Sequence, residues 1–156
     1  MLRSVVFALA AGLMLAPLAL ADEPKSKDKE QLALPQENGT WIPTDGMSAG
    51  KKLPDNFLTS VKLLLNNGKY TVVVGEDKEE GTYKVDTGKS PHPIDIEATM
   101  GPNKGKKIPA IVEIKGDTMR VCYNVDGKER PKDFTSTEEN KFLIISYKRA
   151  KDGEKK

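Results

Sequence analysis

The sequence predicts an all-β protein, a small antiparallel β-barrel of about eight strands. Apolar and polar residues alternate in several short runs, as over 94–98 and 119–124, and this period of two is typical of strands that bury one face. Turn signals such as Asn67-Gly68 separate the runs at intervals of about 8–12 residues. Closing such a meander into a barrel removes the exposed strand edges that invite aggregation.

The chain opens with the pattern of a secretory signal peptide. Arg3 precedes a largely apolar stretch over 5–20, and Ala19 and Ala21 are the small residues that signal peptidase recognises. We predict cleavage after Ala21, which removes residues 1–21. An uncleaved membrane anchor is the alternative, but an apolar run of about 16 residues is shorter than the roughly 20 that span a bilayer. We therefore expect an exported protein, periplasmic or extracellular, without a stable membrane anchor.

Three segments follow the signal peptide. Residues 22–38 are mostly charged and polar and are predicted to be a flexible lead-in, residues 39–150 form the barrel domain, and residues 151–156 form a disordered tail. The predicted strands are Gly39–Pro43, Val61–Asn66, Lys69–Gly75, Gly81–Asp86, Pro93–Thr99, Ile108–Lys115, Thr118–Asn124 and Phe142–Arg149. A short strand near Asp133–Ser136 is a further candidate, and a helical turn is expected over Asp55–Thr59 with Asp55 as its N-cap.

Alternation also assigns the side chains that face the barrel interior. The expected inward set is Trp41, Leu63, Leu65, Tyr70, Val72, Val74, Tyr83, Ile94, Ile96, Val112, Ile114, Met119, Val121, Tyr123, Phe142 and Ile144. The interior of an eight-stranded barrel is either filled by side chains or holds one small ligand. Because the mature chain carries few apolar residues, we expect a largely filled interior, with any ligand at the open end.

Composition excludes several classes of function. The chain has 25 Lys and Arg against 23 Asp and Glu, a net charge of +2, so it lacks the broad basic field of a nucleic-acid-binding protein. Its single Cys and single His exclude an intrachain disulfide, a zinc site with several cysteines, and sites that need two imidazoles. We predict no metal, no cofactor and no nucleic-acid partner. We expect a monomer whose partner is a small molecule or an envelope protein.

The start of the first strand, Gly39-Thr40-Trp41, resembles the G-x-W motif of lipocalin-type barrels. In that family the Trp closes one end of the barrel and a basic residue of the last strand lies across its indole. The resemblance implies that Gly39 and Trp41 close the barrel here and that Arg149 is the basic residue. A guanidinium stacked on indole stabilises by roughly 0.5–2 kcal/mol.

Further motifs are similar to an uncharacterised lipocalin-like domain family of exported planctomycete proteins. They come in one order and span nearly the whole barrel domain: Gly81-Thr82-Tyr83, Ile94-Asp95-Ile96, Gly101-Pro102-Asn103-Lys104-Gly105-Lys106, Gly116-Asp117-Thr118-Met119, Cys122-Tyr123, and Arg130-Pro131 with Phe134. The sequence departs from that family at Ile108-Pro109-Ala110-Ile111, where Pro109 lacks an N–H and predicts a strand edge or bulge. The resemblance implies a lipocalin-like barrel and export, but no activity.

Arg130, Phe134 and Tyr123 are the candidate ligand-binding residues. At the open end of the barrel, the Arg130 guanidinium would bind a carboxylate in bidentate fashion. In the alternative, which we favour, Arg130 pairs with Asp95 or Asp133 and holds a long loop against the barrel, with Phe134 as an apolar plug.

Other polar residues suggest a catalytic alternative. His92, Asp95, Cys122 and Arg130 would support hydrolysis only if they converged, since proton transfer needs hydrogen-bond reach. We favour a His92 in a solvated turn and a Cys122 that packs as a small apolar residue, and we assign no catalytic residue. A non-catalytic binding module is the leading hypothesis, with a filled envelope or inhibitor-like scaffold and a hydrolase as alternatives.

Overall fold

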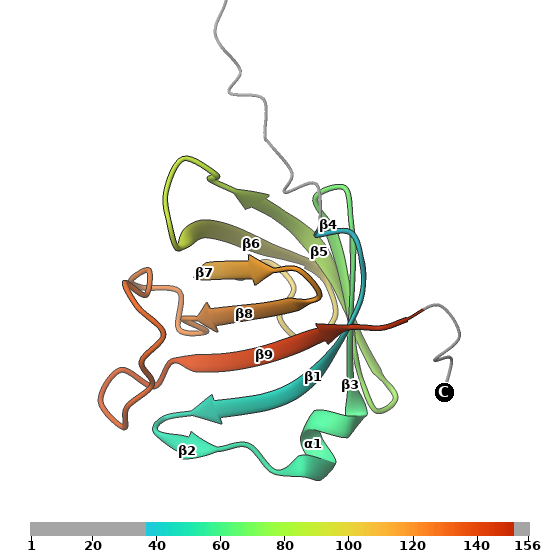
Figure 1. Cartoon of the computed structure of the whole chain (residues 1–156), viewed down its shortest axis with the longest axis horizontal. Helices are drawn as coiled ribbons and strands as arrows, with labels where there is room; N and C mark the ends of the chain where they lie inside the picture. The colour runs from blue at the N-terminus through green and yellow to red at the C-terminus, as the bar shows by residue number, and fades with distance from the viewer. Residues whose placement is uncertain (1–36, 152–156) are drawn as a thin grey trace, which may run out of the picture.

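The computed structural model describes residues 37–151, and these residues form one closed antiparallel β-barrel (Figure 1). The predicted signal peptide, most of the predicted lead-in and residues 152–156 lie outside the described part of the chain. Within residues 37–151, no helix is long and apolar enough to cross a membrane.

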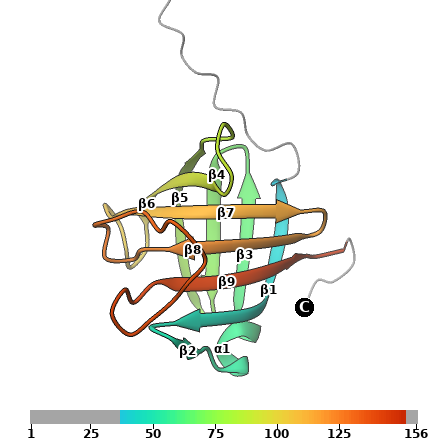
Figure 2. The same ribbon diagram turned by 60° about the vertical axis from the view of Figure 1, so that its left-hand side comes forward.

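Nine strands and one short helix make up the described chain. In order they are β1 (Gly39–Ser48), β2 (Lys51–Lys52), α1 (Asp55–Ser60), β3 (Val61–Asn66), β4 (Lys69–Val74), β5 (Asp77–Val85), β6 (His92–Met100), β7 (Lys107–Lys115), β8 (Thr118–Tyr123) and β9 (Leu143–Arg149). From β3 to β9, each strand pairs with the next one, and β1 pairs with both β3 and β9, so eight strands close the barrel. Strand β2 pairs only with the end of β1, as the second strand of a short hairpin. Figures 1 and 2 show α1 beside one end of this barrel.

Strand β1 closes the barrel because it bends. Its first residues, Gly39 to Trp41, pair with β3, and residues from Trp41 to Ser48 pair with β9. The register shifts between Pro43 and Asp45, which marks a bulge. A bulge increases the local bend and twist of a strand, and this one lets a single strand serve two neighbours.

The local chemistry of the sequence explains most element boundaries. Asn67 and Gly68 both have positive φ, at 48° and 77°, as a two-residue hairpin between β3 and β4 requires. Pro109 pairs with Asp95 of β6 and lies just past the last β7–β8 pair, so its missing N–H falls where β8 has ended.

Several local predictions are wrong. The candidate strand near Asp133–Ser136 is irregular chain, and β2 was not foreseen. Strand β5 begins at Asp77, because the charged run after Gly75 continues the hairpin ladder. Helix α1 is present, but Pro54 is its N-cap residue and Asp55 is its first helical residue, with no side-chain cap.

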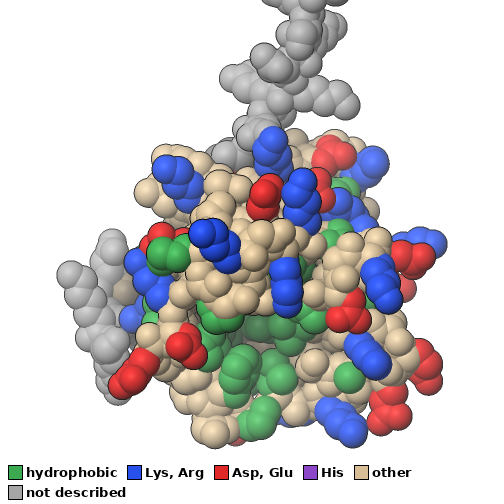
Figure 3. Space-filling view, turned by 180° about the vertical axis from the view of Figure 1, so that it is seen from behind, with side chains coloured by type: hydrophobic (Ala, Val, Ile, Leu, Met, Phe, Trp, Pro, Cys, Tyr) green, Lys and Arg blue, Asp and Glu red, His purple; other side chains and the backbone are tan. Residues whose placement is uncertain are grey.

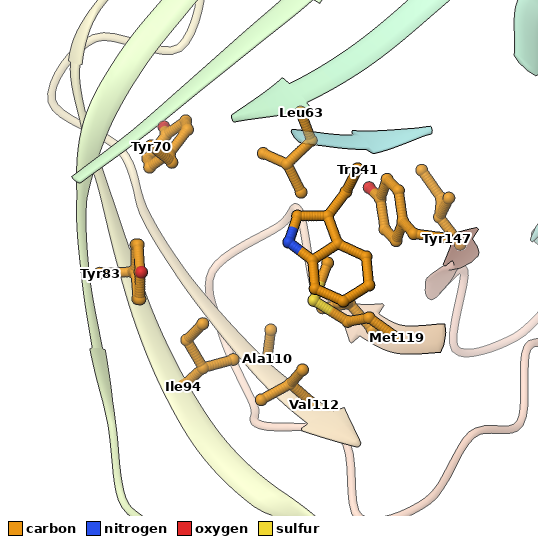
Figure 4. Close-up of a cluster of buried hydrophobic side chains, with 11 residues drawn as sticks. Trp41, Leu63, Tyr70, Tyr83, Ile94, Ala110, Val112, Met119 and Tyr147 are labelled. Atoms are coloured by element: carbon orange, nitrogen blue, oxygen red, sulfur yellow. The ribbon is translucent and has the colours of Figure 1, made fainter. Parts of the chain in front are cut away.

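The barrel interior carries the expected inward set with one correction, at β9. Leu143, Ile145 and Tyr147 face inward, whereas Ile144 pairs with Cys122 on the outer face and Phe142 precedes the strand. Three apolar residues in succession made the alternation ambiguous there. Figure 4 shows Trp41 within the buried cluster, beside Leu63, Met119 and Tyr147.

A long irregular segment between β8 and β9 crosses the outside of the barrel (Figure 2). Ile111 and Cys122 are paired neighbours on the outer face, yet they are only 3% and 0% exposed. Pro131 within the segment is also buried. The fold therefore has a small second apolar layer outside β7 and β8, and the Cys122 thiol belongs to that layer.

A candidate ligand cavity inside the barrel

One end of the barrel is closed by Trp41. The indole is fully buried and its Nε1–H donates to the carbonyl oxygen of Glu37 at 2.8 Å. The guanidinium of Arg149 lies over the ring, 4.3 Å from its centroid, and also donates to the carbonyl oxygen of Asn38. Arg149 Nε lies 3.4 Å from the Asp117 carboxylate. These contacts tie the first and last strands together across the closure.

Gly39 is required by this closure. Its φ is +136°, and a Cβ atom built there would lie 2.7 Å from Arg149 Nη1. Both the backbone conformation and the space for the guanidinium therefore depend on the absence of a side chain. The G-x-W motif has a local steric reason here, independent of any family resemblance.

Above the closure the barrel is hollow. A cavity of about 370 Å³ is lined mainly by apolar side chains from β3 to β9. The expectation of a largely filled interior is therefore wrong. The error arose because the count of apolar residues gives the material for a core but not the diameter that eight tilted strands enclose.

The cavity opens at the end opposite Trp41. Its rim is formed by Phe57 of α1, Asp77 and Lys78 at the start of β5, Pro102 before β7, and Val125 after β8. Phe57 and Val125 are 36% and 43% exposed although they line the cavity. Figure 3 shows hydrophobic side chains around a hollow in the middle of one face, with charged side chains surrounding it.

Polar groups in the cavity wall are few and mostly phenolic. All four tyrosines of the chain, Tyr70, Tyr83, Tyr123 and Tyr147, contribute to the lining. The hydroxyls of Tyr123 and Tyr147 are 3.1 Å apart and share a hydrogen bond. At the closed end the hydroxyl of Tyr83 donates to Oε1 of Glu37 at 2.9 Å, and Glu37 is only 2% exposed.

A second carboxylate, that of Glu79, lies in the cavity wall toward the open end. The hydroxyl of Tyr70 donates to Glu79 Oε1 at 2.9 Å, and the Asn103 amide donates to Oε2 at 2.6 Å. Lys106 Nζ in turn lies 3.0 Å from Asn103 Oδ1, which orients the amide so that its NH₂ group faces Glu79. Gly81 leaves room for this network, because a Cβ there would lie 2.5 Å from the Tyr70 ring.

Burial and neighbouring acids keep the four hydroxyls protonated. Desolvation and the Glu79 carboxylate raise the pKa of Tyr70, and desolvation and Glu37 raise that of Tyr83. Desolvation, with Tyr147 close by, raises the pKa of Tyr123 far above its usual range, and desolvation raises that of Tyr147 to about 12. The cavity wall therefore presents neutral phenols at physiological pH.

Only one of the three predicted ligand-binding residues lines the cavity. Tyr123 does, but Arg130 and Phe134 lie on the outside of the barrel. Arg130 Nη1 donates to the carbonyl oxygens of Ile94 and Ala110 at 2.7 and 2.8 Å, and its Nη2 pairs with Asp95. These contacts agree with the structural alternative favoured from the sequence, in which Arg130 holds the long segment against the barrel, here against β6 and β7.

Phe134 lies beneath a different cation. The guanidinium of Arg120 lies 4.0 Å from the centroid of the Phe134 ring. Arg120 alternates with the inward residues Met119 and Val121, so this contact is on the outer face. Phe134 thus belongs to the covering segment rather than to the mouth.

The side chains of the catalytic alternative do not share one face of the sheet. His92 pairs with the inward residue Val112, whereas Cys122 pairs with the outer residue Ile111. Burial raises the pKa of the Cys122 thiol to about 11, which disfavours a thiolate nucleophile. His92 is half-buried at the start of β6, not in a solvated turn, and its Nδ1 has no hydrogen-bond partner among the described residues.

Sequence reasoning missed the carboxylates of the cavity. Glu37 falls in the predicted lead-in, and Glu79 lies in a charged run that reads as a solvated hairpin tip. One signal was present for Glu79: it is two residues from Gly81 and four from Tyr83, so it shares their inward face once the strand is extended. No group of three or more potential metal ligands exists among residues 37–151.

The fold and the cavity place this chain in the class of small closed β-barrels whose hollow interior opens at one end. Comparison of the chain with protein-family models, curated proteins and solved structures finds no match. The similarity to a lipocalin-like family of exported planctomycete proteins stays a prediction from the sequence motifs.

Proposed function

We propose that this chain is an exported, non-catalytic binding module that holds one small, mainly apolar molecule inside its barrel. The observation that carries the proposal is the open cavity of about 370 Å³ with apolar walls. Cavities of roughly 300–1,000 Å³, apolar with a few placed polar groups, are typical of small-molecule sites. Water in such a space finds few hydrogen-bond partners, so an apolar ligand that displaces it is favoured.

The cavity volume limits the size of the ligand. At roughly 30 Å³ for each water-sized group, the space accommodates about a dozen non-hydrogen atoms. The bound molecule would contact the aliphatic walls along most of its length. Its polar end would lie near the tyrosine hydroxyls or at the charged rim. The proposed export rests on the signal-peptide pattern of residues 1–21.

Two alternatives have weaker support. A scaffold with a filled barrel would not leave a cavity of this size open to the surface. A hydrolase would need its acid, base and nucleophile in hydrogen-bond reach, and His92 and Cys122 face opposite sides of the sheet. A protein partner would dock at the exposed rim around Phe57 and Val125, which is compatible with a ligand inside.

Isothermal titration calorimetry with 1-decanol tests the proposal, since this neutral alcohol matches the volume of the cavity. We expect saturable binding with one site per chain. The variant Val72→Phe should weaken binding at least tenfold, because Val72 lines the cavity and the larger ring would occupy it. The matched control is Val73→Phe. Val73 is the next residue of the strand, faces the opposite side and does not line the cavity, so the affinity should stay within about threefold.

A thermal-shift panel of small lipids, acids and saccharides extends the search to other ligands. Absence of decanol binding together with no stabilisation by any member of the panel would overturn the proposed function. Equal loss of affinity in both valine variants would place the binding site outside the barrel interior.

A further inference from the structure

We infer that the cavity selects amphiphiles whose head group donates hydrogen bonds and carries no negative charge, and that it disfavours fatty-acid-like carboxylates. This inference rests on the proposed function and names the ligand chemistry of the same site. It concerns hydroxyl and ammonium head groups, which share the ability to donate to a carboxylate.

The first argument is the balance of charge along the wall. Toward the open end, the cavity lining includes two acidic residues, Asp77 and Glu79, and one cationic residue, Lys78. The ammonium of Lys78 lies 2.5 Å from Oε1 of Glu80, and Glu80 is not part of the lining. Lys78 pairs with Val73 on the outer side of the hairpin, so its charge is held outside the cavity. A ligand carboxylate therefore has no lining cation directed at it.

The second argument is the orientation of the Glu79 carboxylate. Its two oxygens accept one hydrogen bond each, from Tyr70 and from Asn103. A carboxylate has about four acceptor positions, so these two bonds leave acceptor capacity for a ligand. Tyr70 lies on β4 and Asn103 lies between β6 and β7, and together they fix the orientation of the carboxylate. The head group of a bound ligand would therefore lie beside the Glu79 carboxylate, a hydrogen-bond acceptor whose orientation is fixed.

The third argument is the polarity of the surroundings. Apolar side chains make up most of the wall, and interactions between charges are stronger there than in water. Repulsion between Glu79 and a ligand carboxylate is therefore poorly screened, while an ammonium or hydroxyl gains from the same field. The Tyr123–Tyr147 pair supplies neutral hydroxyls that accept or donate, so it does not oppose this selectivity.

Calorimetric titration with 1-decanol, decylamine and decanoate tests the inference, because the three ligands share one chain and differ in head group. At neutral pH and low salt we expect decylamine and decanol to bind at least tenfold more tightly than decanoate. This comparison uses the unmodified chain and needs no variant. Decanol that binds while decanoate binds as tightly as decylamine would overturn the inference and leave the proposed function standing. Absence of binding by all three ligands, together with no stabilisation in the thermal-shift panel, would remove the proposed function itself.

Variant Glu79→Gln tests the responsible residue. We expect decylamine binding to weaken by about tenfold, decanol binding to weaken by a smaller factor, and decanoate binding to become stronger. The matched control is Glu76→Gln, which makes the same change of charge in the exposed turn just before β5 but outside the cavity lining. Equal shifts for all three ligands in Glu79→Gln, or the same charge-dependent shifts in Glu76→Gln, would assign the selectivity to something other than Glu79.

Discussion

Replacing Arg149 with Met removes the charged side chain that closes the barrel but keeps most of its aliphatic packing. The stack on Trp41 is worth roughly 0.5–2 kcal/mol. A hydrogen bond from a charged group, such as the one to the Asn38 carbonyl, is worth about 1.5–3 kcal/mol. The ion pair with Asp117, whose side chain is 70% exposed, adds about 0–1 kcal/mol.

These contributions are not fully additive, because all three share one guanidinium. The expected loss is therefore about 2–4 kcal/mol of unfolding free energy, or a fall in Tm of about 8–16 °C for a domain of this size. Urea unfolding followed by fluorescence measures the loss directly, since Trp41 is the only tryptophan of the chain and is buried in the closure. Arg149→Lys keeps the positive charge but lacks the planar guanidinium. Its unfolding free energy should lie between those of the unmodified chain and of Arg149→Met.

Arg120→Met is the matched control. Its guanidinium also lies over an aromatic ring, that of Phe134, but Arg120 is exposed on the outer face. We expect a loss of no more than about 1 kcal/mol. If Arg149→Met costs no more than Arg120→Met, the closure does not depend on the contacts described and the reasoning is refuted.

Three further predictions concern other parts of the molecule. Arg130→Met should destabilise by about 2–3 kcal/mol in urea unfolding, because two carbonyl contacts and the Asp95 pair are lost; a loss of decanol affinity at unchanged stability would instead place Arg130 in the site. The Cys122 thiol, with its pKa raised to about 11, should react with iodoacetamide far more slowly at pH 8 than in urea, and equal rates would show that it is accessible. The four tyrosines predict alkaline unfolding: their pKa values are higher in the folded chain than the usual value near 10. Above about pH 10 the unfolded chain therefore holds fewer protons, and stability falls by up to about 1.4 kcal/mol per pH unit for each tyrosine. Below about pH 10 the tyrosines should not reduce the free energy of unfolding. Above it, tyrosinate absorbance should rise in one step, together with the change in Trp41 fluorescence. Tyrosinate that forms before unfolding would contradict the buried positions.

The β9 strand shows where reading a sequence for alternation fails. The pattern is reliable for β6, where Asp95 and Glu97 separate the apolar residues, and for the start of β8, where Arg120 separates Met119 from Val121. The inner faces of both strands were assigned correctly. In β9, Leu143, Ile144 and Ile145 are all apolar, and only the pairing of Ile144 with Cys122 reveals which face is which. The covering segment outside the barrel makes both faces partly apolar, which removes the signal.

The Arg130 cluster illustrates a second limit. Its residue types allowed a ligand contact or a structural contact, and the spacing in the sequence does not decide between them. In the structure Arg130 donates to carbonyl oxygens 36 and 20 residues away, on strands that only the closed sheet brings together. Glu79 was not a candidate because it lies in a run of charged residues, and such a run is typical of a solvated turn. Only the structure shows that this run belongs to β5 and that Glu79 lines the cavity.

The sequence by itself determined most of the β-strands, their turns and the expectation of a closed barrel, because the alternation of side chains and the backbone freedom of residues such as Gly68 are local properties. The closure residues Gly39, Trp41 and Arg149 were expected from a resemblance to the lipocalin motif, and only the tertiary structure places Arg149 over Trp41. Only the tertiary structure shows that the interior is hollow and that Glu37 and Glu79 line the cavity. A cavity is what remains when distant strands have packed, and its volume depends on curvature and register that no local pattern encodes.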